Sequence, residues 1–116
     1  MRKELGDDPV FLIDQHWVYN LNDSIKIGRA FEQLDIALME CPMDAEIFAQ
    51  YSKLCSALDL PIALGEEFRT RFRFKERIDA GGIDIAQPDI GRAGGFTEIR
   101  RISALTSARQ VRLAPH

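Results

Sequence analysis

Five short apolar runs recur along this chain of 116 residues at a nearly constant spacing. The runs cover residues 10–13, 36–39, 61–64, 83–86 and 111–114. Each is followed by a polar residue that could take part in chemistry, and these residues are Asp14, Glu40, Glu66, Asp89 and His116. Their spacing of roughly 25 residues suits one buried strand, one helix and two short loops. The chain is therefore expected to repeat a strand–helix unit.

The segments between the apolar runs carry helical patterns and helix-capping residues. The expected helices are one capped by Asn22 or Asp23 and running to about Leu34, one capped by Asp44 with apolar positions up to Leu58, one over residues 70–80 that stops at Gly81 and Gly82, and one capped near Thr97. Residues 2–5 have the pattern of the end of a further helix. Alternating strands and helices of this kind predict right-handed βαβ units and a parallel sheet.

Two α/β architectures have such a sheet, the open doubly wound sheet and the (β/α)8 barrel. The even spacing, with a polar residue after every strand, favours the barrel. The glycines of residues 91–95 lack the spacing of a dinucleotide-binding loop. About five strands and four helices are fewer than a whole barrel contains. The prediction is therefore a partial TIM-type (β/α) barrel, with residues 1–116 forming one partial barrel domain.

Composition excludes several classes of function. The net charge is −3, the pI is about 5.3, and the basic residues are dispersed among acidic ones, so no nucleic-acid partner is expected. No apolar run approaches the roughly 20 residues of a membrane span, and no signal peptide is visible, so no membrane partner is expected. Cys41 and Cys55 have neither metal-type nor disulfide-type spacing, which favours a reducing, cytoplasmic setting. Nothing near Cys41 would activate it, so a packing role is expected.

Three carboxylates follow three consecutive strands of the expected barrel. Neighbouring strands lie about 4.8 Å apart, so Asp14, Glu40 and Glu66 should converge at one face. Carboxylates held together repel each other unless a cation is present, and oxygen ligands suit a hard ion such as Mg2+. The alternative is that each acid merely caps the helix that follows it. Three acids in register favour the metal site.

Asp89 and His116 follow the next two strands and could form a general base, because a carboxylate beside an imidazole orients it and raises its pKa. The alternative is a histidine without a role. His16 stands two positions after Asp14, and strand alternation would point both side chains the same way. His16 is then expected across the metal from His116, as a second proton-transfer group.

These pieces resemble the mandelate racemase / muconate lactonizing enzyme group of the enolase superfamily. The matching segments are residues 14–16, 39–42, 65–66, 69–74, 80–85, 87–98 and 114–116, which cover essentially the whole chain in the right order. The resemblance implies a segment of a (β/α)7β barrel in which Asp14, Glu40 and Glu66 bind Mg2+. It also implies a catalytic base formed by Asp89 and His116. The histidine at position 16 is similar to that of the acid-sugar dehydratases of the group, the galactonate dehydratases among them.

In such enzymes the base removes the proton α to a substrate carboxylate while the metal stabilises the enolate. His16 would protonate the departing β-hydroxyl, giving a 2-keto-3-deoxy acid. The expected substrate is thus a small sugar acid, and a racemase, an epimerase or a non-catalytic remnant stay as alternatives. The family's capping domain and remaining strands are expected to be absent. Open strand edges then predict a homo-oligomer. Cys41 stands where many relatives have Glu or Asp.

Overall fold

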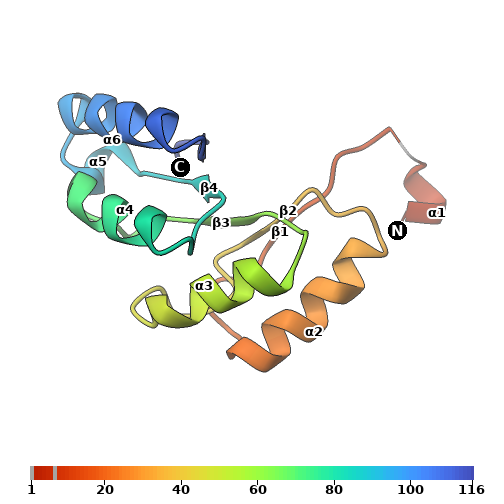
Figure 1. Cartoon of the computed structure of the whole chain (residues 1–116). Coiled ribbons are helices and arrows are strands. Elements are labelled where there is room, and N and C mark those ends of the chain that lie inside the picture. The colour runs from red at the N-terminus through yellow and green to blue at the C-terminus, as the bar shows by residue number, and fades with distance from the viewer. Residues whose placement is uncertain (1, 7) are drawn as a thin grey trace.

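In the computed structural model, which describes residues 2–6 and 8–116, five parallel strands form one sheet in chain order. The strands are β1 (Leu12–Asp14), β2 (Leu38–Glu40), β3 (Ile62–Leu64), β4 (Ile85–Ala86) and β5 (Arg112–Leu113). The helices are α1 (Arg2–Leu5), α2 (Leu21–Glu32), α3 (Phe48–Ala57), α4 (Thr70–Asp79), α5 (Ile90–Ala93) and α6 (Phe96–Ala108). The helices that connect the strands lie on one side of the curved sheet (Figure 1).

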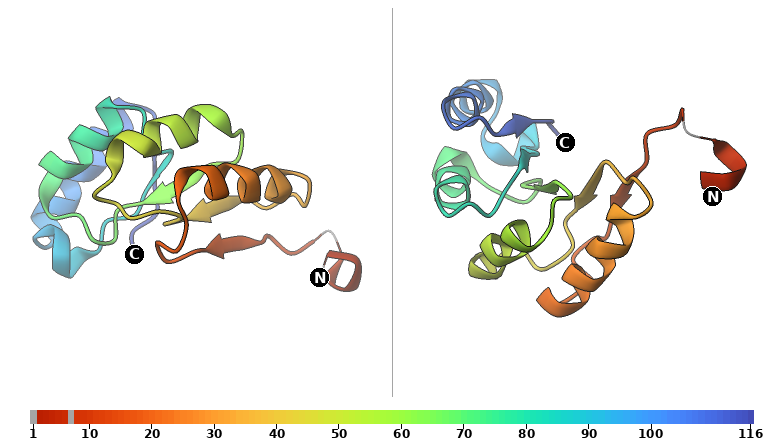
Figure 2. Two further views of the ribbon diagram at one scale, coloured as in Figure 1. Left: turned by 90° about the horizontal axis from the view of Figure 1, so that it is seen from below. Right: turned by 45° about the vertical axis from the view of Figure 1, so that its right-hand side comes forward.

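The sequential strand order and the one-sided helices identify the architecture. A doubly wound sheet would carry helices on both faces, whereas a (β/α) barrel carries them only outside. Figure 2 shows the connecting helices following one another along the outer side of the strands. The chain is therefore a partial (β/α) barrel, as the spacing of its apolar runs predicted. None of the helices in the described ranges is long and apolar enough to cross a membrane.

The core lies between the sheet and its helices. The central strand β3 is buried along its whole length, and Met39 on β2 is fully buried beside it. Tyr51 and Leu54 of α3 and Phe74 of α4 cover these strands and are fully buried. The Tyr51 hydroxyl donates to the carbonyl of Met43 and accepts from the N–H of the same residue at 3.1 Å. That pair of bonds fixes the segment after β2 against α3.

Three of the predicted helix starts differ from the observed ones by two or three residues. The residue that caps α2 is Asn20, whose side chain accepts from the N–H of Asp23 at 3.0 Å. Asp44 does not cap α3; it accepts from the N–H of Glu46 at 2.9 Å in a turn that precedes the helix. The last long helix begins at Phe96 rather than after Thr97. The short helix α5, which Asp89 caps, was not predicted.

Glu98 on α6 ties this helix to the first turn of α4. One of its oxygens accepts from the N–H of Arg71 at 2.8 Å, and both accept from the Arg71 guanidinium at 2.8 Å. Arg101 donates to the same carboxylate at 3.1 Å. The backbone N–H of Arg71, followed by the two guanidinium groups, holds the pKa of Glu98 below its ordinary value. The carboxylate form is therefore part of the helix–helix contact.

Replacing Glu98 by Gln is expected to lower the free energy of unfolding at neutral pH but to matter little in acid. Because the pKa of Glu98 is depressed in the folded chain, its contribution is complete above the ordinary value of 4.5 and is lost as the pH falls through the folded value. Urea unfolding of both proteins at several pH values would measure this. A difference that stays constant from neutral pH to below about pH 4 would contradict it.

Candidate functional site

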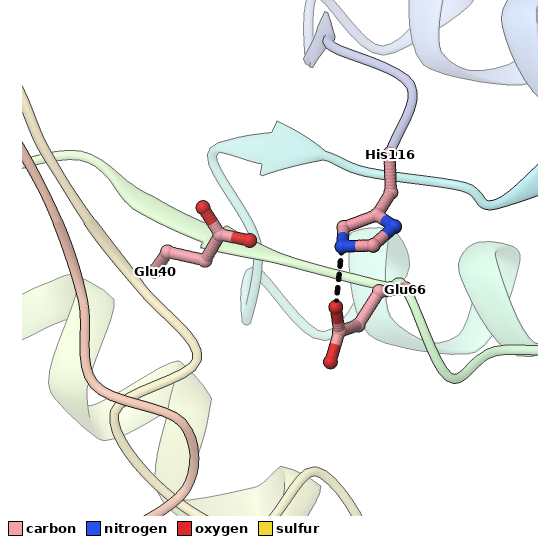
Figure 3. A group of neighbouring side chains, drawn as sticks. All are labelled: Glu40, Glu66 and His116. Atoms are coloured by element: carbon pink, nitrogen blue, oxygen red, sulfur yellow. Dashed lines mark ion pairs between the residues drawn. The ribbon is translucent and has the colours of Figure 1, made fainter.

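Glu40, Glu66 and His116 meet at the carboxyl ends of the strands. Glu40 is the last residue of β2, Glu66 stands two residues after β3, and His116 stands three residues after β5. One ligand atom from each lies within 4.8 Å of the other two. In Figure 3 the three side chains point into a common space from three separate segments of the ribbon. Two of the three predicted metal ligands and the predicted base therefore lie together.

His116 is held from both sides of its ring. Its Nε2 lies 2.7 Å from an oxygen of Glu66, and its Nδ1 lies 3.8 Å from an oxygen of Asp89. Its backbone N–H donates to the carbonyl of Pro88 at 3.2 Å, so the last residue is anchored beside the segment after β4. The predicted pair of Asp89 and His116 are neighbours, but the closer partner of the imidazole is Glu66, which sequence reasoning missed.

Asp89 is held in position because it is the N-cap residue of α5. Its side chain accepts from the N–H of Arg92 at 2.7 Å. This backbone bond, helped by the N–H of Gly91 and by the charges of His116 and Arg92, holds the pKa of Asp89 below its ordinary value. The group is a carboxylate at neutral pH and faces one ring nitrogen of His116. It can orient the imidazole.

Asp14 stands in register with Glu40 on the neighbouring strand, as expected of two ligands at one sheet edge. Its carboxylate, however, accepts from the N–H of His16 at 2.9 Å, and its atoms are not among those of the Glu40–Glu66–His116 group. The backbone of Asp14 therefore lies at the same sheet edge as Glu40, but the Asp14 side chain is bonded to the loop that follows β1.

His16 does not continue the strand alternation of β1, contrary to the prediction. β1 ends at Asp14, and both His16 and Trp17 have positive φ, 47° and 63°. Such a left-handed turn interrupts the extended conformation, so the spacing of two residues does not fix the direction of the imidazole. The ring of His16 stacks on that of Trp17 with centroids 4.4 Å apart. His16 is not part of the group formed by Glu40, Glu66 and His116 in the described chain.

Cys41 and Glu67 adjoin the site, and sequence reasoning gave Glu67 no role. Cys41 is 1% exposed, as its predicted packing role requires. Burial, together with the charges of Glu67, Glu66 and Glu40, raises the pKa of its thiol far above the ordinary value. Burial likewise raises the pKa of Glu67. The acid pair at positions 66 and 67, just after an apolar run, was the signal that could have drawn attention to the second acid.

Comparison with known proteins gives consistent results over the whole chain. A family model described as enolase C-terminal domain-like matches residues 1–116. The D-galactonate dehydratase of Cronobacter sakazakii is 37% identical over 116 residues, which are 100% of this chain and 30% of that protein. The chain thus spans about 30% of the length of the curated relatives that it matches.

Solved structures of enzymes also match this chain over nearly its whole length. The L-talarate dehydratase from Polaromonas sp. JS666, complexed with Mg and L-glucarate, has a TM-score of 0.95 and 30% identity, covering 99% of this chain and 31% of that one. The 3,6-anhydro-D-galactonate cycloisomerase from Zobellia galactanivorans has a TM-score of 0.95 and 36% identity, covering 99% and 33%. The five strands and the helices that connect them are therefore arranged as in these enzymes.

Proposed function

Because the chain belongs to the enolase C-terminal domain-like family, we propose that it is the catalytic segment of a Mg2+-dependent acid-sugar dehydratase. The observation that carries the proposal is the meeting of Glu40, Glu66 and His116 at the carboxyl ends of three strands, with Asp89 behind the histidine. The names of the relatives support it, since a galactonate dehydratase and a talarate dehydratase are among them. Both act on compounds that carry a carboxylate.

The residues fit a magnesium ion. Glu40 and Glu66 present carboxylate oxygens within 4.8 Å of each other, and Asp14 stands in register with Glu40. Hard oxygen donors of this kind are those that Mg2+ prefers. We assign Asp14, Glu40 and Glu66 as the residues that would hold it. When bound, Mg2+ supplies positive charge that offsets these carboxylates and the negative charge that develops on a substrate carboxylate.

His116 is assigned as the general base. It lies beside the two glutamates, so a carboxylate substrate held there would bring its α-proton within reach of the imidazole. Asp89 stabilises the imidazolium that forms when the proton is taken. His16 is assigned as the acid that gives a proton to the departing β-hydroxyl. This last assignment requires the turn after β1 to direct the His16 ring toward the substrate.

Incubation of the chain with Mg2+ and candidate sugar acids in D2O would test the proposal. A dehydratase gives a keto acid that reacts with semicarbazide. A racemase or epimerase exchanges the α-proton without loss of water, an alternative that the similarity to a solved racemase from Streptomyces coelicolor A3(2) supports. If the chain binds Mg2+ but gives neither proton exchange nor keto acid with any of the sugar acids, it is a non-catalytic remnant and the proposal is wrong.

Replacing Glu40 by Gln is expected to weaken Mg2+ binding by at least about 100-fold, because the amide retains the shape but not the charge of the ligand. Isothermal titration calorimetry of both proteins would measure the change. Glu46→Gln is the matched control, since the Glu46 side chain is 75% exposed and its nearest cation, Arg73, is 4.0 Å away. If the two substitutions weakened Mg2+ binding equally, the cause would be the general loss of negative charge, and Glu40 would not be a ligand.

A further inference from the structure

The side chain of Arg77, in the last turn of α4, is almost completely buried although it is charged. It is 1% exposed. Its guanidinium carbon lies over two aromatic rings, 4.4 Å from the centroid of Phe48 and 5.1 Å from that of Phe68. A cation over the face of a ring is attracted by the ring electrons, and a flat guanidinium stacks there better than an ammonium group. Aromatic side chains thus replace solvent around this cation.

The nitrogens of Arg77 make two further contacts. Nη2 donates to the carbonyl of Ala45 at 3.3 Å, and Nη1 pairs with a carboxylate oxygen of Glu76 at 2.8 Å. Removing a charged group from water is costly, and a hydrophobic residue of similar volume could fill the same space without that cost. Packing alone therefore does not explain an arginine at this position.

The contacts of Arg77 join two loops at the carboxyl ends of neighbouring strands. Ala45 lies in the loop after β2, and Phe48 begins α3 directly after that loop. Phe68 lies in the loop after β3, residues 65–69, which leads into α4. From α4, the guanidinium stacks on the second loop and bonds to the first. One side chain therefore sets how far apart the two loops lie.

Both loops are held tightly between the contacts of Arg77 and the assigned glutamate ligands near their starts. In the loop after β2, the hydroxyl of Tyr51 bonds both backbone polar groups of Met43. In the loop after β3, the N–H of Phe68 donates to the carbonyl of Gly65 at 3.0 Å, which closes the chain into a turn. A change in the spacing of the loops is therefore passed on to the glutamates.

We propose that Arg77 is a positioning residue for the Mg2+ site, because it sets the separation of Glu40 and Glu66. This role rests on the proposed function, in which both glutamates hold the ion. Arg77 acts through Ala45 and Phe68 rather than by contact with the ion. Mg2+ demands nearly ideal octahedral geometry, whereas Ca2+ accepts flexible coordination. A site whose glutamates are spaced less rigidly should therefore lose Mg2+ more than Ca2+.

Calorimetric titration of Arg77→Met with Mg2+ and with Ca2+ tests this role. Methionine fills much of the space but cannot donate to a carbonyl. Mg2+ binding should weaken by about 10–100-fold, as for other groups that orient metal ligands, and Ca2+ binding by less than about 3-fold. Loss of a positive charge would by itself favour a bound cation, so weaker Mg2+ binding cannot be an effect of charge.

Lys75→Met is the matched control, because it removes one positive charge from the same helix at a side chain that is 57% exposed. It should leave the ratio of Mg2+ to Ca2+ affinity unchanged. An unchanged ratio in Arg77→Met, or an equal change in Lys75→Met, would overturn the proposal. A partly unfolded variant loses both ions in proportion, so the ratio separates positioning from a loss of stability.

Phe48→Leu removes one of the two stacking rings and tests the proposal even if Arg77→Met does not fold. It should lower the ratio of Mg2+ to Ca2+ affinity in the same direction, and an unchanged ratio would overturn the proposal. If the proposed function itself is wrong, the wild-type chain binds no Mg2+, or Glu40→Gln binds it as tightly as the wild type. Those results are obtained without any variant of Arg77, so the two failures are distinguishable.

Discussion

Replacement of His116 by Asn is expected to slow exchange of the substrate α-proton by about 10²–10⁴-fold, the contribution of a well-placed general base. The amide keeps polarity and approximate size but cannot take up a proton at neutral pH. The imidazole lies 2.7 Å from Glu66 and 3.8 Å from Asp89, beside the assigned Mg2+ ligands, so loss of its basic nitrogen should slow the exchange directly. Proton NMR of a sugar acid incubated with Mg2+ in D2O would measure exchange.

His16→Asn is the matched control, because His16 is assigned to the leaving group rather than to the α-proton. This substitution should reduce keto-acid formation while exchange of the α-proton continues. Calorimetry should find Mg2+ binding intact in both variants, which separates a lost base from a lost metal. Equal loss of exchange in the two variants would contradict the separate roles assigned to the two histidines. Normal exchange in His116→Asn would mean that His116 is not the base.

The order of elements could be predicted from the sequence because it depends on few residues. Apolar runs that recur about every 25 residues, joined by helical segments, allow few arrangements once parallel strands and right-handed crossovers are required. Helix starts could not be predicted as well. Asn20, Asn22 and Asp23 are all good caps within four positions, and the choice of Asn20 depends on where β1 ends and how its turn leads into α2.

The packing of α2 was harder to foresee for a different reason. Its apolar residues Ile25 and Phe31 pack against the core but are only partly buried, whereas the buried positions of this helix are Ser24 and Gly28. A Cβ on Gly28 would lie 2.3 Å from a methyl carbon of Leu58, so α2 approaches the end of α3 through a residue that has no side chain. Hydrophobic periodicity does not register such a close contact.

In the candidate site, too, some features could be predicted from the sequence and others could not. That Glu40, Glu66 and His116 would share one face follows from the parallel sheet alone. The partner of His116 and the direction of His16 depend on loop conformations after the strands, such as the positive φ of His16 and Trp17. Sequence patterns give little information on such turns when they contain no glycine. Strand ends could thus be predicted, and side-chain pairings could not.

Glycine at position 65 is the residue on which the geometry of the site most depends, and Gly65→Ala is expected to lower the free energy of unfolding by about 2–6 kcal/mol. Its φ of 133° is a conformation that other residues adopt only with strain. An added Cβ would also lie 2.6 Å from a ring carbon of Phe74 and 3.3 Å from the N–H nitrogen of Gln87. Phe74 is fully buried and packs edge-on against Phe68, so it cannot swing away.

Gly81→Ala separates strain from collision. Gly81 also has a positive φ, 65°, but an added Cβ there would meet nothing within 4 Å. Its substitution should cost only about 1–2 kcal/mol, and urea unfolding of the two variants would measure the difference. Because Gly65 directly precedes Glu66, the same change should weaken Mg2+ binding, whereas Gly81→Ala should not. Equal costs for the two substitutions would mean that the chain after β3 can shift, and that Glu66 is not held as rigidly as a metal ligand requires.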